Sequence, residues 1–435
     1  MNRALGYSCI FFVLLASSAW AQTYMGIEDA IKIGLEKNFA ILIAKNQTQV
    51  AQLQNNLGNA GMSPQLSLNG GAVFSNINSF QEFVNGTSQE RNNAQSSGYS
   101  AVLHLDMKVY DGNKMFAIKK RLDQTENLSA LQLRQQMENL IYEVMLAYYN
   151  IVRLDVMIRT EKQNLLIYQE RKKIAKLKME VGSDSKVDFL LSQSDENRAK
   201  STIVQMELQM LDAKTKLNNL IGLSAETDYS TEDTIKVNYS PTIEDLKKEL
   251  NKKNAMILIA KQQTQISEQY VKEARSNVLP YLNLGLDYRY LQNKSQAGFL
   301  AANNQNGLFA ELTAGWLLFN GNKNRNLIRE MNLYNLNQQV ILKQTELEVD
   351  ALVQLNYRRF LLSKQIAELE MSNLIDSREL QFISMERYRV GKTNLLEIIE
   401  AQKNLEDAQY RYINALYSVK IAEAELLRAN GELVK

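Results

Sequence analysis

The fold is decided by the stretch from Tyr99 to Val109, which reads YSAVLHLDMKV. All of its odd-numbered residues are apolar. The polar residues fall on even positions: Ser100, His104, Asp106 and Lys108. This alternation predicts a β-strand with one apolar and one polar face. A tilted strand of about 10 to 12 residues is long enough to cross a bilayer.

Three further stretches share the pattern, so the strand is one of four. Alternation precedes it at Leu66 to Phe74 and returns in the same phase at 282–290 and 308–318. Between the members of each pair we expect surface loops, at Asn76–Ser97 and Gln292–Asn306. The sequence therefore predicts two β-hairpins whose strands are about 10 to 12 residues long.

Each hairpin lies within one of two copies of a longer unit. The sequence ILIAK at residues 41–45 returns at 257–261, an offset of 216 residues, and Gly-Asn-Lys at 112–114 returns at 321–323, an offset of 209. The two offsets differ by seven residues because the expected loop of the first hairpin is seven residues longer than that of the second. We therefore expect tandem repeats over residues 22–222 and 243–435, joined by the polar linker 223–242.

Helical spacing of apolar residues flanks both hairpins. It predicts helices over residues 27–59 and 243–276, with Pro64 and Pro280 ending helix and opening strand. Thus each repeat is expected to begin with a helix and continue into its hairpin.

A long proline-free segment follows each hairpin. The two segments, 114–181 and 323–390, have 68 residues each, which makes a helix of about 100 Å. Gly182 and Gly391 stand where such helices would end. Shorter helices are expected after these glycines, over 185–221 and 394–430. Helices of this length are typical of coiled coils.

The composition excludes several kinds of active site. The 435 residues include one His, one Cys and three Pro, and the net charge is only +2. A Ser-His-Asp triad, a Cys-His dyad or a His/Cys zinc site needs more such groups, and no Gly-rich phosphate loop is present. We expect neither enzymatic activity, nor a cofactor, nor a metal, nor nucleic-acid binding.

The first 21 residues read as a secretory signal peptide. Arg3 precedes the apolar stretch Cys9–Ala16, and Ala19-Trp20-Ala21 forms a cleavage pattern. Cleavage before Gln22 would leave no cysteine. No other segment approaches a transmembrane helix, so the exported protein is either soluble or enters a membrane as strands.

Four strands cannot close a membrane barrel, because the smallest has about eight and an open edge is not tolerated in lipid. Two, three or four chains would supply eight, twelve or sixteen strands. The strand count alone does not determine the number of chains in the barrel. Long helices continuing from the strands would extend the barrel as a tube, which implies transport.

Together these features resemble the TolC-type outer-membrane efflux factor family. The resemblance covers about residues 24–431 and rests on the leader, the tandem units, the two prolines, the Gly-Asn-Lys strand exits and the two turns. Its most specific parts are the turns at Met179–Asp188 and Tyr388–Glu400. The chain ends at Lys435, so the extra C-terminal segment of longer members is expected to be missing or short.

The resemblance implies a homotrimer with a twelve-stranded barrel in outer-membrane lipid and a helical barrel in the periplasm. The two turns would close its tapered end. It further implies an export channel that works with a periplasmic adaptor and an inner-membrane pump. The alternative is a structural coiled-coil protein of the periplasm or cell surface without a pore, which leaves the hairpins unused.

The resemblance also implies a gate. In the family, an acidic residue six positions after the first-turn glycine bonds to a Tyr and an Arg around the second turn. The matching residues are Asp188, Tyr388 and Thr393, so the Arg is absent and the adjacent Lys392 is expected to supply a charge. A gate held by Asp188 and Tyr388 is expected, unless Asp188 only caps its helix.

Two glutamates match the family's pore constriction. Glu397 and Glu400 are three residues apart, which puts them on one helix face. Converging in a trimer, they are expected to select cations.

A basic run precedes the first turn: Arg171, Lys172, Lys173, Lys176 and Lys178. We interpret it as a solvated helix face, with adaptor docking as the alternative.

Overall fold

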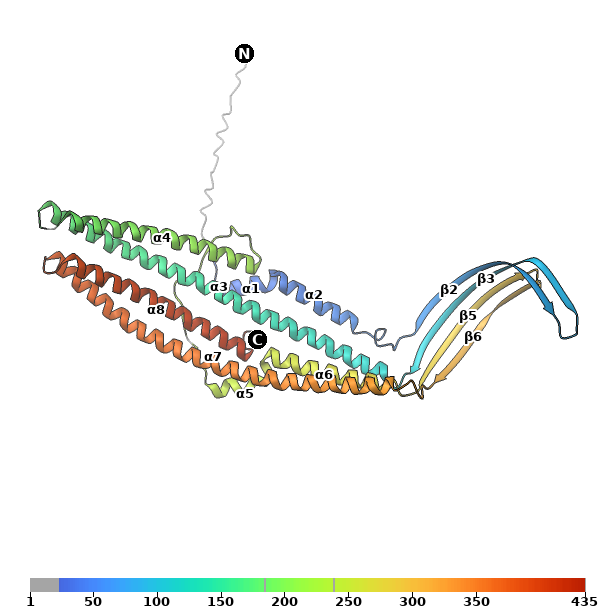
Figure 1. Ribbon diagram of the computed structural model, residues 1–435. Helices are drawn as coiled ribbons and strands as arrows, with labels where there is room; N and C mark the ends of the chain where they lie inside the picture. The colour runs from blue at the N-terminus through green and yellow to red at the C-terminus, as the bar shows by residue number, and fades with distance from the viewer. Residues whose placement is uncertain (1–22, 184, 238, 435) are drawn as a thin grey trace, which may run out of the picture. The chain divides into compact units, whose positions relative to one another are not determined.

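The computed structural model describes residues 23–183, 185–237 and 239–434 (Figure 1). The expected signal peptide, residues 1–21, lies outside the described residues. The first half contains α1 (Ile27–Lys37), α2 (Phe39–Gln54), β2 (Gln65–Glu82), β3 (Ser88–Tyr110), α3 (Lys114–Glu180) and α4 (Lys186–Ile221). The second half contains α5 (Ile243–Lys253), α6 (Ala255–Ser276), β5 (Tyr281–Ser295), β6 (Ala302–Gly315), α7 (Lys323–Arg389) and α8 (Leu395–Asn430).

The chain divides into two compact units, which do not coincide with the sequence halves. The sheet unit consists of residues 35–142, 238–363 and 422–435. The turn unit consists of the residues up to 34, 143–237 and 364–421. Four of the five unit boundaries therefore fall within helices, in α1, α3, α7 and α8, and the fifth falls between α4 and α5.

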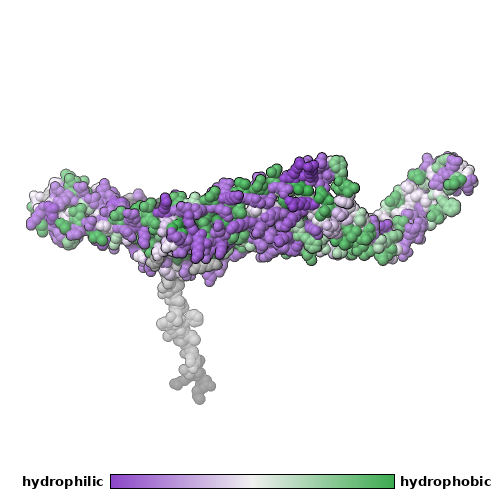
Figure 2. Space-filling view, turned by 90° about the horizontal axis from the view of Figure 1, so that it is seen from below, coloured by the Kyte–Doolittle hydropathy of each residue, from purple (hydrophilic) through white to green (hydrophobic). Residues whose placement is uncertain are grey.

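The four long strands form one antiparallel sheet in the order β2-β3-β5-β6. Cross-strand pairing keeps apolar residues together, as in the row Leu68, Leu103, Tyr288 and Leu308. Polar residues align on the other face, as in the row Lys108, Asn283 and Thr313. The row of apolar side chains is solvent-exposed. Figure 2 shows apolar surface over the sheet and the adjoining helix ends.

The polar segments expected as loops are mostly strand, so this prediction was wrong. In Asn76–Ser97 the pairing of β2 with β3 continues to Glu82 and Ser88, which leaves only 83–87 between the strands. In Gln292–Asn306 the pairing of β5 with β6 leaves 296–301. Backbone hydrogen bonds hold a ladder whatever the polarity of its side chains. The strands are therefore longer than expected, at 14 to 23 residues.

The two short helices expected before the hairpins are each divided in two. Asn38 Oδ1 accepts a hydrogen bond from the Ala40 amide (2.8 Å) and starts α2, and Asn254 Oδ1 accepts one from the Ile257 amide (3.1 Å) and starts α6. An asparagine that caps a new helix competes with continuation of the old one. In addition, α2 ends at Gln54, five residues before the expected end.

The long helices confirm the sequence prediction, with 67 residues each. Within the sheet unit α2 lies beside the first part of α3, and α6 beside the first part of α7 (Figure 1). The same bond occurs at both contacts: Thr48 Oγ1 donates to the Ser129 carbonyl and Thr264 Oγ1 to the Gln338 carbonyl, each at 3.4 Å.

In the turn unit, the buried Tyr148 of α3 is hydrogen-bonded to the segment that follows α4. The Tyr148 hydroxyl donates to the Met25 carbonyl (3.0 Å) and accepts from the Glu232 amide (3.1 Å). Close by, β1 (Thr23–Tyr24) pairs with β4 (Tyr229–Ser230). Burial raises the pKa of Tyr148 to about 12. The hydroxyl therefore keeps its proton over the physiological pH range.

None of the helices in the described part of the chain combines the length and apolar character needed to traverse a membrane.

Candidate functional site

The turn unit contains two helical hairpins, α3–α4 and α7–α8, whose turns have the same construction. Gly182 and Gly391 adopt φ of 77° and 73°, a left-handed conformation that glycine adopts without strain. The Ser183 amide donates to the Lys178 carbonyl and the Lys392 amide to the Arg387 carbonyl, both at 2.9 Å. These bonds satisfy the last carbonyls of α3 and α7.

After the first turn, Asp188 is bonded to Ser185, the N-cap residue of its helix. Its amide donates to Ser185 Oγ (3.3 Å), and the Ser185 hydroxyl donates to the Asp188 carboxylate (3.2 Å). Ser185 thus caps α4, and Asp188 stands in the first turn of that helix. In the single chain Asp188, one of the expected gate residues, is therefore engaged at the start of α4.

After the second turn, Glu397 is paired and Glu400 is not. The Glu397 carboxylate accepts from Arg387 Nη1 (2.7 Å) and from the Thr393 hydroxyl. Its amide donates to Asn394 Oδ1 (3.1 Å). Glu400 is exposed and has no polar partner among the described residues. The two expected constriction carboxylates therefore differ in effective charge.

Tyr388, the second expected gate residue, lies in the apolar interior of the α7–α8 hairpin. Its side chain is 1% exposed and packs in a cluster with Met385, Leu395 and Ile398. Lys178 Nζ lies 3.9 Å from the centre of its ring, a distance typical of a cation–π contact. Lys392 is exposed. This cluster packs the second hairpin next to its turn.

The interpretation of the basic run before the first turn as a solvated face was wrong for Arg171, which is buried, but was confirmed for Lys173 and Lys176, which are exposed. The Arg171 side chain is buried against Asp195, and Lys172 Nζ lies 2.6 Å from a Glu196 carboxylate oxygen. A buried guanidinium needs a partner, and α4 supplies it.

These ion pairs follow the geometry of the hairpins. Two antiparallel helices joined by a tight turn bring together residues at equal distances from that turn. Arg171–Asp195 and Lys162–Glu207 (3.0 Å) obey this rule around the first turn. Arg411–Glu370 (3.0 Å) obeys it around the second. The pairing across each hairpin could therefore have been predicted from the sequence.

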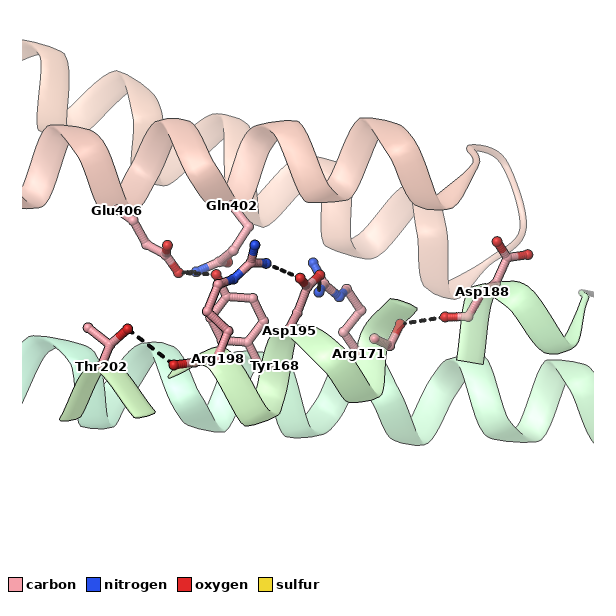
Figure 3. A network of polar contacts seen from close by, with 9 residues as sticks. Tyr168, Arg171, Asp188, Asp195, Arg198, Thr202, Gln402 and Glu406 are labelled. Carbon is pink, nitrogen blue, oxygen red and sulfur yellow. Dashed lines mark hydrogen bonds and ion pairs between the residues drawn. The ribbon is translucent and has the colours of Figure 1, made fainter. Parts of the chain in front are cut away.

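A polar layer joins α3 to α8 farther from the turns (Figure 3). The Tyr168 hydroxyl donates to the Glu406 carboxylate, which also accepts from Gln402 Nε2 (3.2 Å). Arg171 lies over the Tyr168 ring, 5.0 Å from its centre. One turn away from this contact along α8, the Tyr410 hydroxyl donates to Glu161 (2.6 Å). The layer therefore holds two carboxylates between the hairpins.

Burial raises the pKa of the Glu406 carboxyl above its ordinary value of 4.5. The folded state thus favours the protonated form, and the contribution of this group to stability is complete below pH 4.5 and lost as the pH rises through the raised value.

We therefore expect Glu406→Gln, which removes the charge and keeps an acceptor for Tyr168, to raise the melting temperature at neutral pH by about 2 °C. The difference should vanish in acid. Circular dichroism melts at several pH values measure it. Glu400→Gln is the matched control, because it removes an exposed charge from the same helix. A lower melting temperature for Glu406→Gln at every pH would contradict the assignment.

Comparison with known proteins gives one family. The model of the outer membrane efflux protein family matches residues 30–223 and 246–432. The search of curated protein sequences found no match.

Several solved membrane proteins share the fold. The outer-membrane channel OprN superposes with a TM-score of 0.78 at 16% identity, over 93% of this chain and 89% of its own. CusC gives 0.77 at 15% identity, over 97% and 96%. VceC of Vibrio cholerae gives 0.77 at 14% identity, over 93% and 96%. At these identities the likeness is one of fold.

Proposed function

Because this chain belongs to the outer membrane efflux protein family, we propose that three copies of it form an export conduit in which a periplasmic adaptor and an inner-membrane pump feed the substrate. The protein is located in the outer membrane, and its long helices extend into the periplasm. No catalytic step is assigned to any residue.

One observation carries the proposal: the sheet has an apolar face and two open edges. Among the described strands, β2 and β6 each pair on one side only. Unpaired backbone groups are not tolerated in lipid. Since β2 and β6 run antiparallel, β2 of one copy can pair with β6 of the next. Three copies then close a barrel of twelve strands, the number expected for the family.

The tandem repeat belongs to the same proposal. The Thr48–Ser129 and Thr264–Gln338 bonds are related by the offsets of 216 and 209 residues found in the sequence. They support repeats at 22–222 and 243–435 around the linker 223–242. With two similar helix-and-hairpin units in each of three chains, six similar units would surround the barrel axis.

The experiment is native mass spectrometry of the detergent-solubilised protein, with conductance of the same sample in planar bilayers. We expect three chains and discrete channels. Recovery as a soluble periplasmic protein without conductance would favour the alternative, a structural coiled-coil protein. Cross-linking from the turn unit in whole cells would identify the adaptor.

The gate remains a proposal built on Asp188, Tyr388, Lys392 and Thr393. Asp188 is held by Ser185 and Thr393 by Glu397 in the single chain, so a closed tip would need these groups to exchange partners or to add bonds between copies. We expect Asp188→Ala and Tyr388→Phe to raise the closed-state conductance in planar bilayers. Unchanged conductance in both would remove the gate assignment.

A further inference from the structure

The junction between the strands and the helices has a luminal side. A cavity of about 850 Å³ there is lined by Lys108 and Asn283, which belong to the polar face of the sheet. Lys114 at the start of α3 and Lys323 at the start of α7 line the same cavity. These two lysines therefore mark the luminal faces of their helices.

Other basic residues lie on the opposite faces of these helices. Counted around α3 from Lys114, Phe116 and Lys120 lie at about 200° and 240°. Counted around α7 from Lys323, Arg325 lies at about 200°. Trp316 follows β6 in the phase of its apolar residues, and its Nε1 donates to the Val278 carbonyl (3.0 Å). This side of the junction continues the apolar face of the sheet.

Two cavities open on this outer side, and basic residues line both. One, of about 400 Å³, is lined by Lys120, Lys272 and Arg275 together with the exposed Phe116. The other, of about 220 Å³, is lined by Trp316 and Arg325. Among the described residues that line these two cavities, none is acidic. They are concave, basic and bordered by apolar side chains.

The basic residues of these cavities are not used by the fold. Lys120, Lys272, Arg275 and Arg325 are all exposed, and none has an ion-pair partner among the described residues. The neighbours of Lys120 differ: Lys119 pairs with Asp123, and Arg121 pairs with Glu273 (2.6 Å) across to α6. The neighbouring basic residues on α3 are thus paired, while the four basic residues at the cavities have no ion-pair partner among the described residues.

We propose that Lys120, Lys272, Arg275 and Arg325, together the basic collar, bind the headgroups of anionic phospholipids in the periplasmic leaflet of the outer membrane. The inference rests on the proposed function, which sets the apolar face of the sheet in lipid. Where that face ends, phosphate groups replace acyl chains, and unpaired cations attract anionic lipids there. Phe116 and Trp316 occupy the interfacial position that aromatic residues prefer.

Trp316 supplies a local probe. The chain has two tryptophans, Trp20 and Trp316. Trp20 lies in the expected signal peptide, so after cleavage before Gln22 all tryptophan fluorescence comes from beside the basic collar. The protein is reconstituted in vesicles of equal parts phosphatidylglycerol and phosphatidylcholine. Bromine, a quencher, is placed on the acyl chains of one lipid or of the other, so the two samples have the same charge.

We expect brominated phosphatidylglycerol to quench Trp316 about twofold more strongly than brominated phosphatidylcholine. The variant Lys120→Gln, Lys272→Gln, Arg275→Gln, Arg325→Gln should bring the ratio to about one. The matched control, Lys108→Gln with Lys323→Gln, removes luminal charges and should keep the twofold ratio. Inorganic phosphate at millimolar concentration should leave the ratio unchanged.

Equal quenching by both lipids in the unmodified collar would overturn the inference and leave membrane insertion standing. A ratio abolished by inorganic phosphate would assign the collar to a free anion and overturn the lipid assignment. Absence of quenching by either lipid would contradict the proposed function itself.

Discussion

Leu103→Arg should prevent stable insertion in the outer membrane. Leu103 lies in the middle of the apolar run of β3, between Leu68 and Tyr288 on the neighbouring strands. An arginine facing lipid near the bilayer midplane costs about 2–4 kcal/mol, and a trimer would carry it three times. We expect a large loss of outer-membrane protein on fractionation and a lower free energy of unfolding in vesicles titrated with urea.

The control is the adjacent residue of the same strand. Val102 faces the polar side of the sheet, opposite Asn69 and Arg289, so Val102→Arg puts the same charge into the lumen. It should insert nearly as well as the unchanged protein. If both variants insert equally, the apolar face of the sheet does not meet lipid. If Val102→Arg is the worse of the two, the polar face is the one that meets lipid.

The strands and long helices could be predicted because each depends on a local period. The alternation around Leu103 and the proline-free run before Gly182 were both confirmed as strand and helix. The extent of the hairpins could not be predicted from polarity, because Ser88 and Gln89 pair through their backbones, not their side chains. The breaks at Asn38 and Asn254 were missed because an asparagine within an apolar period gives no sign of whether it caps.

The candidate site was harder to predict, since its contacts join distant segments. The resemblance to the family singled out Glu397 and Glu400 as expected constriction residues, but it did not reveal that Arg387 pairs with the first of them. The buried Arg171 was taken for a surface residue because its partner Asp195 lies on the following helix. Charge pairs at equal distances from a glycine turn would have predicted it. The Tyr168–Glu406 contact joins two different hairpins, so the spacing of residues along the sequence could not have predicted it.

The pairing of Glu397 changes the expected charge of the proposed constriction. With Arg387 beside Glu397, each chain contributes one net negative charge to a ring of the three copies, and that charge is Glu400. The Arg387 side chain is 50% exposed and the Glu397 side chain 37%, so the pair itself is weak. Its effect on permeating ions nevertheless cancels at a distance, because opposite charges lie together.

We therefore expect Glu400→Gln alone to lower the preference for cations over anions, on the order of tenfold, because a narrow site lined by one sign of charge concentrates counter-ions. Arg387→Gln should raise the preference for cations, since it leaves the negative charge of Glu397 without its partner. The measurement is the reversal potential in a salt gradient across a planar bilayer, with native mass spectrometry to verify that each variant keeps its assembly.

Glu379→Gln serves as the charge-matched control, because Glu379 lies on α7 more than two turns before Arg387. If Glu400→Gln and Arg387→Gln shift the potential in the same direction, or neither shifts it beyond the control, then the two glutamates do not form the constriction.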